Sequence, residues 1–373
     1  MKIYLHIGTE NTGTTSIQKF FLLNRKELKK QGIYYPNIDE SNHVSLTLFA
    51  SNNFDRISGL IPFQFSNKKF NKDTYKNNIE TKLSTEISKL SKNIHTIIFS
   101  NEHCSSRLLD VDEMSILKGL LEKISNEIKI VVYIKRQDEL LLSQYNTYVK
   151  SGGTDNKAEY INYCYDSNNP NYYNNWVTLN KWASIFGKEN LIIRVFDKPK
   201  LLKGSIIHDF LDLLNIKTND RYVFPEPQNK SFDNLTIEFL RNFNKHIPLY
   251  TVNGVNHDRY NIDEILASFS EKKYKTTNPL RLNQFYTSFE ESNKLVAKAY
   301  FNRDVLFDET NLYKYSPEEE KSQEITIDEA FKIFSKIWIS GVDHNGKGLN
   351  KMLHSKIFIY MKLCLRFIYR LFK

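Results

Sequence analysis

The chain has 373 residues, of which 40% are hydrophobic and 13% aromatic, and it carries a formal net charge of +9 at pH 7. This composition excludes a disordered or fibrous chain and suits one large α/β domain or two fused units. The positive charge favours an anionic ligand, an anionic membrane surface or nucleic acid as a partner. The chain has an odd number of cysteines, and they lie far apart and form no C-x-x-C motif: Cys104, Cys164 and Cys364. Neither a disulfide framework nor a zinc site is therefore expected.

The N-terminal half alternates between short apolar runs and amphipathic segments. The apolar runs predict strands over 3–7, 32–35, 96–99, 128–134 and 191–196. Helical periodicity predicts helices over 14–30, 75–90, 113–124, 140–149 and 172–186. The polar, Asn-rich stretch 37–73 is expected to form a loop or excursion. Continuous apolar strands between helices are typical of a parallel sheet covered on both faces.

After about Pro225 the strand signal ends, and helical patterns follow over 234–245, 262–270, 290–301 and 327–340. We therefore expect an α/β core over 1–225 and a helical C-terminal part of the same domain over 226–340. Residues 341–373 are expected to form a linker and a basic amphipathic tail helix. The chain enters a strand directly and has no run of eighteen apolar residues, so neither a signal peptide nor a spanning helix is expected.

The tail has a periodic charge pattern of its own. Lys362, Arg366 and Arg370 recur at every fourth residue of an otherwise strongly apolar segment, which places them on one stripe of a helix. Such a stripe is typical of a helix at an anionic membrane interface, and packing on the core is the alternative. We therefore expect a cytoplasmic protein that contacts the inner face of the membrane through residues 355–373.

A glycine loop follows the first predicted strand and precedes the first predicted helix. Gly8 and Gly13 have the spacing of a Walker A loop, but Thr14 stands where that motif has its lysine. Loop amides across 9–15 and the helix N-terminus would point at one anion, with the Thr14 and Thr15 hydroxyls as further donors. The loop thus predicts a site for a phosphate-like group that is not held as an ATPase holds it, with a simple tight turn as the alternative.

Two further predicted strands end in polar residues. Lys135 and Arg136 follow strand 128–134, and Ser143 lies in the helix after them. Because ligands bind at the carboxyl ends of parallel strands, these residues predict a second anion site, and a solvated Lys-Arg pair is the alternative.

The strand over 96–99 ends in Ser100, Asn101, Glu102 and His103. A carboxylate and an imidazole at the same sheet edge would supply a general base, although such a pair is often only a surface feature.

In this order the segments resemble the sulfotransferase superfamily. GTENTGTTSIQ is similar to that family's loop for the 5′-phosphosulfate of PAPS (3′-phosphoadenosine 5′-phosphosulfate), and VVYIKRQDELLLSQY to its 3′-phosphate-binding strand, loop and helix. More narrowly, residues 1–310 resemble bacterial sulfotransferase-domain proteins of surface glycan pathways, with FSNEHCSSRL and YFNRDVLFDE as supporting segments.

The resemblance implies a P-loop-like three-layer α/β core with helical C-terminal additions. It also implies sulfuryl transfer from PAPS to a hydroxyl of a glycan or glycolipid, without a metal. The 5′-phosphosulfate would lie on the loop residues Gly8, Thr9, Glu10, Asn11, Thr12, Gly13, Thr14 and Thr15. The 3′-phosphate would meet Arg136 and Ser143, with Lys135 beside them. Glu102 and His103 are the favoured bases, followed by His43 in a region that also holds Asp39 and Glu40.

Two positions depart from the pattern of this family. Asn11 stands where the family usually has Lys or Arg, whose charge bridges the leaving phosphate and the sulfuryl group. The usual spacing of eight residues places Lys135, rather than Arg136, in register with Ser143. An NTP-dependent kinase and a non-catalytic nucleotide- or glycan-binding relative are the alternative functions. Nucleic-acid binding is not expected, because the basic residues form no patch interleaved with aromatic residues.

Overall fold

The computed structural model describes residues 1–60, 71–166, 170–226, 232–252, 254–259, 262–270, 279–308 and 325–340. These residues fall into two compact units. The first is drawn from 1–140, 169–228 and 286–310, and the second from 141–168, 229–285 and 311–373. The division does not follow the predicted boundary at residue 225, because 286–310 returns to the first unit and 141–168 leaves it. The predicted linker and tail helix, 341–373, lie outside the described residues.

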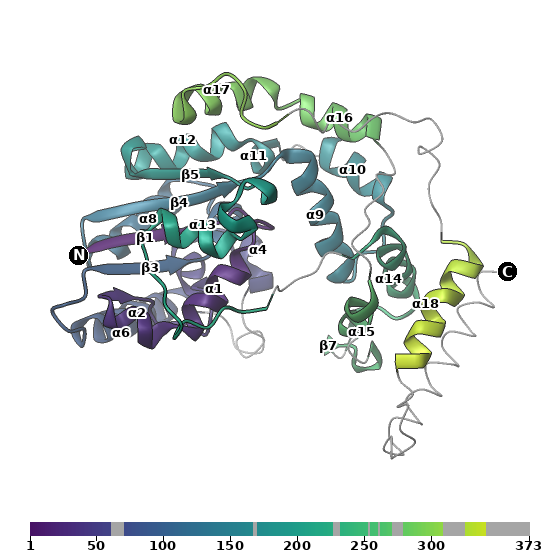
Figure 1. The fold of residues 1–373 in the computed structure, drawn as a ribbon, viewed down its shortest axis with the longest axis horizontal. Helices are drawn as coiled ribbons and strands as arrows, with labels where there is room; N and C mark the ends of the chain where they lie inside the picture. Colours follow the sequence, from purple (N-terminus) through teal and green to yellow (C-terminus); the bar gives the residue numbers. More distant parts are fainter. Residues whose placement is uncertain are drawn as a thin grey trace, which may run out of the picture. The chain divides into compact units, whose positions relative to one another are not determined.

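The first unit contains a sheet of five parallel strands in the order β2-β3-β1-β4-β5 (Figure 1). Its strands are β1 (Lys2–His6), β2 (Ile33–Tyr34), β3 (Thr96–Ser100), β4 (Glu127–Ile134) and β5 (Leu191–Val195). The central strand β1 pairs with β3 from Lys2 and Thr96 to His6 and Ser100, and with β4 on its other side. Because every pairing is parallel, the carboxyl ends of the strands meet at one edge of the sheet.

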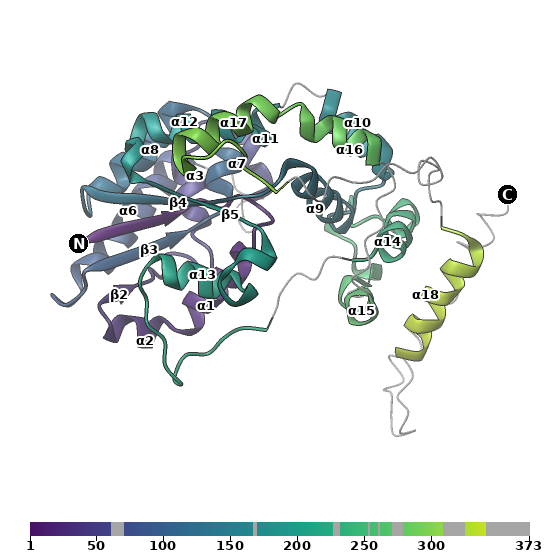
Figure 2. The same cartoon turned by 45° about the horizontal axis from the view of Figure 1, so that its top comes forward.

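Helices cover both faces of this sheet, as the continuous apolar strands predict (Figure 2). On one face, Ile130 and Val132 of β4 pack with residues of α6 (Lys72–Ser88), α8 (Val111–Glu122) and α12 (Asn175–Phe186). On the other face, Val131 and Tyr133 pack with α1 (Thr14–Leu23) and α13 (Ile206–Leu213). Each fully buried aliphatic side chain contributes about 1.5–3 kcal/mol to folding. The predicted class, an α/β P-loop-like three-layer core with helical C-terminal additions, is confirmed.

The second unit has a hydrophobic core of its own. Helix α9 (Gln137–Lys150) begins in the first unit and ends in the second, where Tyr145 and Val149 are fully buried. They belong to a cluster with residues of α14 (Asn234–His246), α15 (Ile262–Phe269) and α18 (Ile327–Ser340). These helices and α17 (Glu290–Phe301) lie where helical periodicity predicts them. The expectation that strands end at Pro225 is wrong, because β6 (Tyr250–Thr251) and β7 (Gly254–Val255) form an antiparallel pair.

Asparagine residues divide two of the predicted helices. The helix expected over 14–30 breaks at Asn24, so that α1 is followed by α2 (Arg25–Lys30). The Asn24 side chain donates to the carbonyls of Phe20 and Val223, each at 2.8 Å, and accepts from the Val223 amide at 2.8 Å. The break therefore serves to hold a distant segment against α1. Likewise, Asn174 separates α11 (Pro170–Tyr173) from α12 and caps the latter.

Of the loop or excursion expected over 37–73, the part that the structure describes is an excursion with helices of its own and not a plain loop. This stretch contains α3 (Val44–Ala50), α4 (Phe54–Ile57) and a short 3-10 helix (Ser58–Leu60), and α6 begins at Lys72. Helix α3 forms because its residues from 45 to 50 are all buried within the first unit. Among the described residues, four further α-helices have no predicted counterpart: α7 (His103–Arg107), α10 (Lys157–Asp166), α13 and α16 (Pro279–Thr287).

A fully buried carboxylate on α8 holds the α3–α4 segment in place. Glu113 Oε1 accepts hydrogen bonds from Ser51 Oγ at 3.0 Å and the Asn52 amide at 2.6 Å, and it pairs with Arg56 Nη2 at 3.0 Å. Its second oxygen accepts from the amides of Leu109 and Asp110 at the start of α8. One carboxylate thus caps α8 and anchors the segment that the sequence leaves without a pattern.

None of the helices that the structure describes is both long enough and apolar enough to cross a membrane.

We predict that Glu113→Gln destabilises the first unit by roughly 2–5 kcal/mol, because the amide keeps only one acceptor oxygen in a fully buried position and leaves Arg56 with the charge of Asp110 alone. Urea unfolding followed by circular dichroism measures the loss. The matched control is Glu122→Gln on the same helix, where the carboxylate is exposed and pairs with Lys118 at 3.7 Å. That change should cost less than about 1 kcal/mol, and equal losses for the two variants would contradict this role of Glu113.

Candidate functional site

The loop between β1 and α1 requires glycine at both of the positions that the motif places there. Gly8 has φ of +97°, and a Cβ on it would lie 3.0 Å from Glu102 Cα. Gly13 has φ of +83°, and a Cβ on it would lie 3.0 Å from Ile206 Cγ2. Larger residues would therefore strain the backbone and displace the neighbouring segments. The two glycines bring the loop close to the end of β3 and to the start of α13.

Backbone hydrogen bonds fix the loop to the neighbouring strand β4. The Thr9 amide donates to the Tyr133 carbonyl at 2.9 Å, and the Tyr133 amide donates to the Gly8 carbonyl at 2.7 Å. The Thr9 hydroxyl also donates to the Tyr133 carbonyl, and the Thr12 hydroxyl donates to the Thr9 carbonyl at 2.6 Å. The Thr9 hydroxyl thus joins the loop to β4, and the Thr12 hydroxyl forms a hydrogen bond within the loop.

The N-terminus of α1 is suited to an anion. Its N-cap is Gly13, which has no side chain to cap the helix, and the first turn contains no acidic residue. The first amides of a helix have no acceptor within the helix and carry the positive end of its dipole. Thr14 is buried at this first turn, and Thr15 is partly exposed beside it.

Asn11 has a left-handed backbone conformation, with φ of +60°. After glycine, asparagine is among the residues that adopt this conformation most readily. The residue that departs from the family pattern therefore matches the local backbone of the loop, although it brings no charge.

Glu10 is the centre of a hydrogen-bond network in this loop. Its Oε1 lies 3.1 Å from His103 Nδ1 and accepts from Ser106 Oγ at 2.7 Å, and its Oε2 accepts from the Tyr172 hydroxyl at 2.8 Å. Arg107 Nη2 lies 3.8 Å from the same carboxylate. Burial alone would raise the pKa of Glu10, but the hydrogen bond from His103, the Arg107 charge and the two hydroxyls lower it to about 2. Glu10 is therefore ionised at neutral pH.

The two favoured bases have different surroundings. Glu102 Oε2 accepts a hydrogen bond from Gln18 Nε2 of α1 at 2.6 Å, so this carboxylate connects α1 to the end of β3. His103 begins α7, and its amide donates to Asn101 Oδ1 at 2.8 Å. Its side chain is 21% exposed, and Nδ1 is occupied by Glu10. Within the described residues, no hydrogen bond is found for His103 Nε2.

His43 is buried against Ser100, the last residue of β3. Its Nδ1 accepts from the Ser100 amide at 3.0 Å, and its Nε2 lies 3.0 Å from the Pro36 carbonyl. Burial is the main reason that its pKa is lowered to about 4. Both ring nitrogens are used to join β3 to the segment after β2, so His43 is placed as a structural residue and not as a base at the loop.

Lys135 and Arg136 differ in what surrounds them at the end of β4. Arg136 is 5% exposed and pairs bidentately with the fully buried Asp138, with Nε–Oδ1 and Nη2–Oδ2 distances of 2.8 and 2.7 Å. Lys135 is half-buried, with Nζ 5.6 Å from the centre of the Phe196 ring. Burial lowers the pKa of Lys135, while the charges of Glu139 and Asp138 oppose that shift.

Ser143, the third residue predicted for the second anion site, lies on α9 beyond the point at which that helix enters the second unit. Its relation to Lys135 thus rests on the spacing in the sequence.

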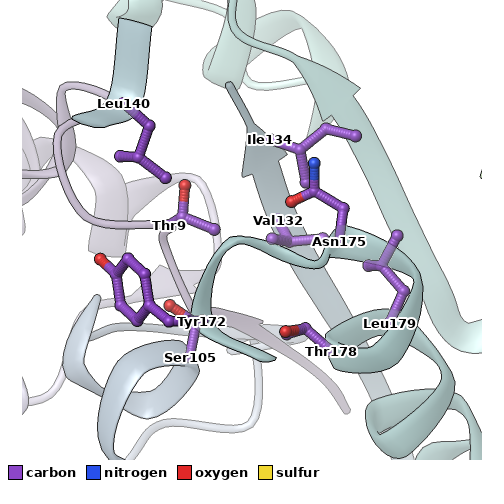
Figure 3. A pocket seen from close by; sticks show the side chains of 9 residues that line it. All are labelled: Thr9, Ser105, Val132, Ile134, Leu140, Tyr172, Asn175, Thr178 and Leu179. Atoms are coloured by element: carbon purple, nitrogen blue, oxygen red, sulfur yellow. The ribbon is translucent and has the colours of Figure 1, made fainter. Parts of the chain in front are cut away.

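A small cavity lies beside Thr9 in the first unit (Figure 3). Its polar wall includes Ser105 of α7, Tyr172 of α11, and Asn175 and Thr178 of α12. Asn175 is 7% exposed, and its Nδ2 has no hydrogen-bond partner among the described residues. The cavity therefore places polar side chains of three helices next to the loop.

Within the part of the chain that the structure describes, no three His, Cys, Asp or Glu side chains are grouped closely enough to hold a metal ion.

Sequence reasoning did not find the partners of Glu10. Ser106 and Tyr172 are 96 and 162 residues away from it, and the sequence assigns neither of them a role in the site. The only available signal was the adjacency of Arg107 and Ser106 to the predicted base in FSNEHCSSRL. Their contact with the loop follows from the pairing of β1 with β3, which no local pattern encodes.

Comparison with known proteins gives two similarities, and no family model matches the chain. An uncharacterized protein of Archaeoglobus fulgidus is 27% identical over 188 residues, which are 48% of this chain and 49% of that protein. The chain thus spans about half the length of the curated relative that it matches. The crystal structure of a sulfotransferase from Alicyclobacillus acidocaldarius covers 62% of this chain, at a TM-score of 0.35 and 13% identity, with 86% of that chain included.

We predict that His43 makes the stability of the first unit depend on pH between about 6.5 and 4. Its folded pKa lies below its unfolded value, so the unfolded state binds the extra proton and stability falls as the pH is lowered through this window. One proton corresponds to a slope of about 1.4 kcal/mol per pH unit. His43→Gln, measured by urea unfolding, should show a shallower slope than the wild type. His6, whose pKa burial lowers to about 3, is unchanged in both proteins. Identical slopes would show that His43 is not buried in its neutral form.

Proposed function

We propose that this chain is a PAPS-dependent sulfotransferase. The observation that carries the proposal is the arrangement at one edge of the sheet: β1, β3 and β4 are neighbours, and their carboxyl ends lead into the anion loop, His103 and Lys135 respectively. An anion-binding loop, a base and a cation on adjacent strand ends are the parts that sulfuryl transfer requires. The sequence resemblance to the sulfotransferase superfamily supports this assignment.

The loop fits the 5′-phosphosulfate of PAPS. Gly8 and Gly13 have positive φ and little space for a Cβ, and the first turn of α1 begins at Thr14 without a side-chain cap. An anion at this position would be held by backbone amides, with Thr14 and Thr15 at the first turn. Glu10, although part of the loop, is not a ligand in this proposal, because its carboxylate is turned to His103, Ser106 and Tyr172.

For the 3′-phosphate we favour Lys135 over Arg136. The Arg136 guanidinium already forms a bidentate pair with Asp138, and a phosphate would have to compete with that buried carboxylate. Lys135 lies eight residues before Ser143, which is the spacing at which the family resemblance places the phosphate ligand. Arg136 is then a structural residue that positions the turn between β4 and α9.

When bound, PAPS supplies a sulfuryl group, whose sulfur forms a bond to the acceptor oxygen as its bond to the phosphate oxygen breaks. We assign the base to His103, since its partly exposed side chain is anchored through one nitrogen only. His103 Nε2 takes the proton of the acceptor hydroxyl. The Asn101 side chain accepts a hydrogen bond from the His103 amide and so fixes the start of α7. Glu102 remains the second candidate for the base.

The acceptor in this proposal is a hydroxyl of a glycan or glycolipid, as the sequence resemblance implies. A cytoplasmic location with membrane contact through 355–373 belongs to the same proposal and rests on the charge pattern of the tail. A kinase is the second candidate, because the loop has Walker spacing, but Thr14 stands in place of the phosphate-binding lysine. A non-catalytic relative is the third, because Asn11 carries no charge.

We predict that PAP, the desulfo product, binds to the full chain and that Lys135→Ala weakens this binding by about 1.5–3 kcal/mol. Adenosine 5′-phosphosulfate, which lacks the 3′-phosphate, should be affected far less, because only one ligand loses a charged contact. Titration calorimetry measures both affinities. The matched control is Lys200→Ala, which removes an exposed cation that pairs with Asp197 and Asp308 in the same unit. Equal losses for the two nucleotides would overturn the assignment of Lys135, and tighter binding of ATP–magnesium than of PAP would favour the kinase.

We predict that Asn11→Lys raises sulfuryl transfer, or hydrolysis of PAPS, by one order of magnitude or more, since a cation at this position would stabilise charge on the leaving phosphate. The matched control is Asn11→Gln, which lengthens the side chain without adding charge. Both variants place a less tolerant residue in the left-handed conformation, so the comparison between them isolates the charge. Activity that falls equally in both would mean that Asn11 acts through the loop backbone.

A further inference from the structure

The carboxylate of Glu10 determines which nitrogen of His103 carries a proton. Glu10 is ionised at neutral pH, and a carboxylate in that form can only accept hydrogen bonds. The 3.1 Å contact between Glu10 Oε1 and His103 Nδ1 is therefore a hydrogen bond in which Nδ1 is the donor. A neutral imidazole has one proton on its ring nitrogens, so Nε2 is left with a lone pair.

Other donors keep Glu10 in place for this contact. Ser106 Oγ binds the same oxygen as His103 at 2.7 Å, and the Tyr172 hydroxyl binds the other oxygen at 2.8 Å. The two come from α7 and α11, so the carboxylate is held from two elements. With both oxygens occupied, its orientation toward Nδ1 is defined before any ligand binds.

From this geometry we propose that Glu10 is the positioning residue of the site: it holds His103 as the tautomer whose bare Nε2 accepts the proton of the acceptor hydroxyl. The inference rests on the proposed function for the identity of that acceptor. Glu10 does not itself receive the proton or contact the sulfuryl group. Once Nε2 is protonated, the adjacent carboxylate also stabilises the resulting imidazolium charge.

The loop would thus have two functions. Its amides and the N-terminus of α1 would hold the anionic group, while the Glu10 side chain prepares the base. The same eight residues, 8–15, therefore couple the placement of the donor to the protonation state of His103. A carboxylate at position 10 is required by this coupling and not by anion binding.

The tautomer of His103 is measured first, by ¹⁵N NMR of the histidine-labelled full chain, with the His103 signals assigned by comparison with His103→Gln. In the wild type near neutral pH, we expect a protonated Nδ1 and a bare Nε2. In Glu10→Gln, the amide can either donate to or accept from Nδ1, so we expect a mixture of the two tautomers. Tyr172→Phe retains the carboxylate and removes one support, and it should keep the wild-type tautomer in larger proportion than Glu10→Gln.

Activity is measured second. Glu10→Gln should lower kcat for sulfuryl transfer at least tenfold while changing PAP affinity less than twofold, because a base in the wrong tautomer cannot accept the proton. Glu27→Gln is the matched control, because it removes a carboxylate that pairs with Lys30 on α2, and it should leave kcat unchanged.

The outcomes separate the inference from the proposed function. A wild-type His103 protonated at Nε2, or a Glu10→Gln variant with unchanged tautomer and kcat, would overturn the role of Glu10 while leaving sulfuryl transfer intact. The expected tautomers in a protein that neither binds PAP nor transfers a sulfuryl group would support the Glu10–His103 pair and overturn the proposed function. If Glu10→Gln does not fold, the wild-type tautomer and Tyr172→Phe still decide the inference.

Discussion

The pairing of β1 with β3 on one side and β4 on the other is the constraint on which the site depends. Because the three strands are parallel, the chain leaves each of them at the same edge of the sheet, and three segments far apart in the sequence begin side by side. The close approach of Gly8 to Glu102 and the hydrogen bonds between Gly8, Thr9 and Tyr133 then fix the distances within this edge. A glycine loop with another neighbour would lack the contacts with Glu102 and His103 on which the proposed function rests.

Buried and half-buried carboxylates organise the first unit although the chain as a whole is positively charged. Glu113 anchors the α3–α4 segment, Asp138 occupies the guanidinium of Arg136, and Glu10 holds His103. In each case several donors converge on one carboxylate, which offsets the cost of removing its charge from water. The excess of lysine and arginine is therefore a poor guide to ligand contacts, because a cation next to the site can be committed to a carboxylate of the protein itself.

The histidines show how surroundings divide residues of one type into different roles. His6 and His43 are buried near aromatic rings, and desolvation keeps both neutral well below neutral pH. His43 uses both nitrogens to join two backbone segments, whereas His103 is partly exposed and uses one nitrogen toward a carboxylate. The ability to exchange a proton with a ligand requires the second arrangement, and residue type and position in a motif do not distinguish the two.

The sequence by itself determined the five strands, most of the long helices, the two glycines of the loop and the side of the sheet at which the polar residues gather. These features depend on local periodicity, on the backbone freedom of glycine and on the direction of parallel strands, all of which can be followed along the chain. Only the tertiary structure decided that Asn24 breaks a helix to hold Val223, that Asp138 occupies Arg136, that His43 is buried, and that Glu10 meets His103, 93 residues away. Such contacts depend on which surfaces meet when the sheet assembles. The interactions that stabilise them form between segments far apart in the chain, and no local pattern in either segment identifies the other.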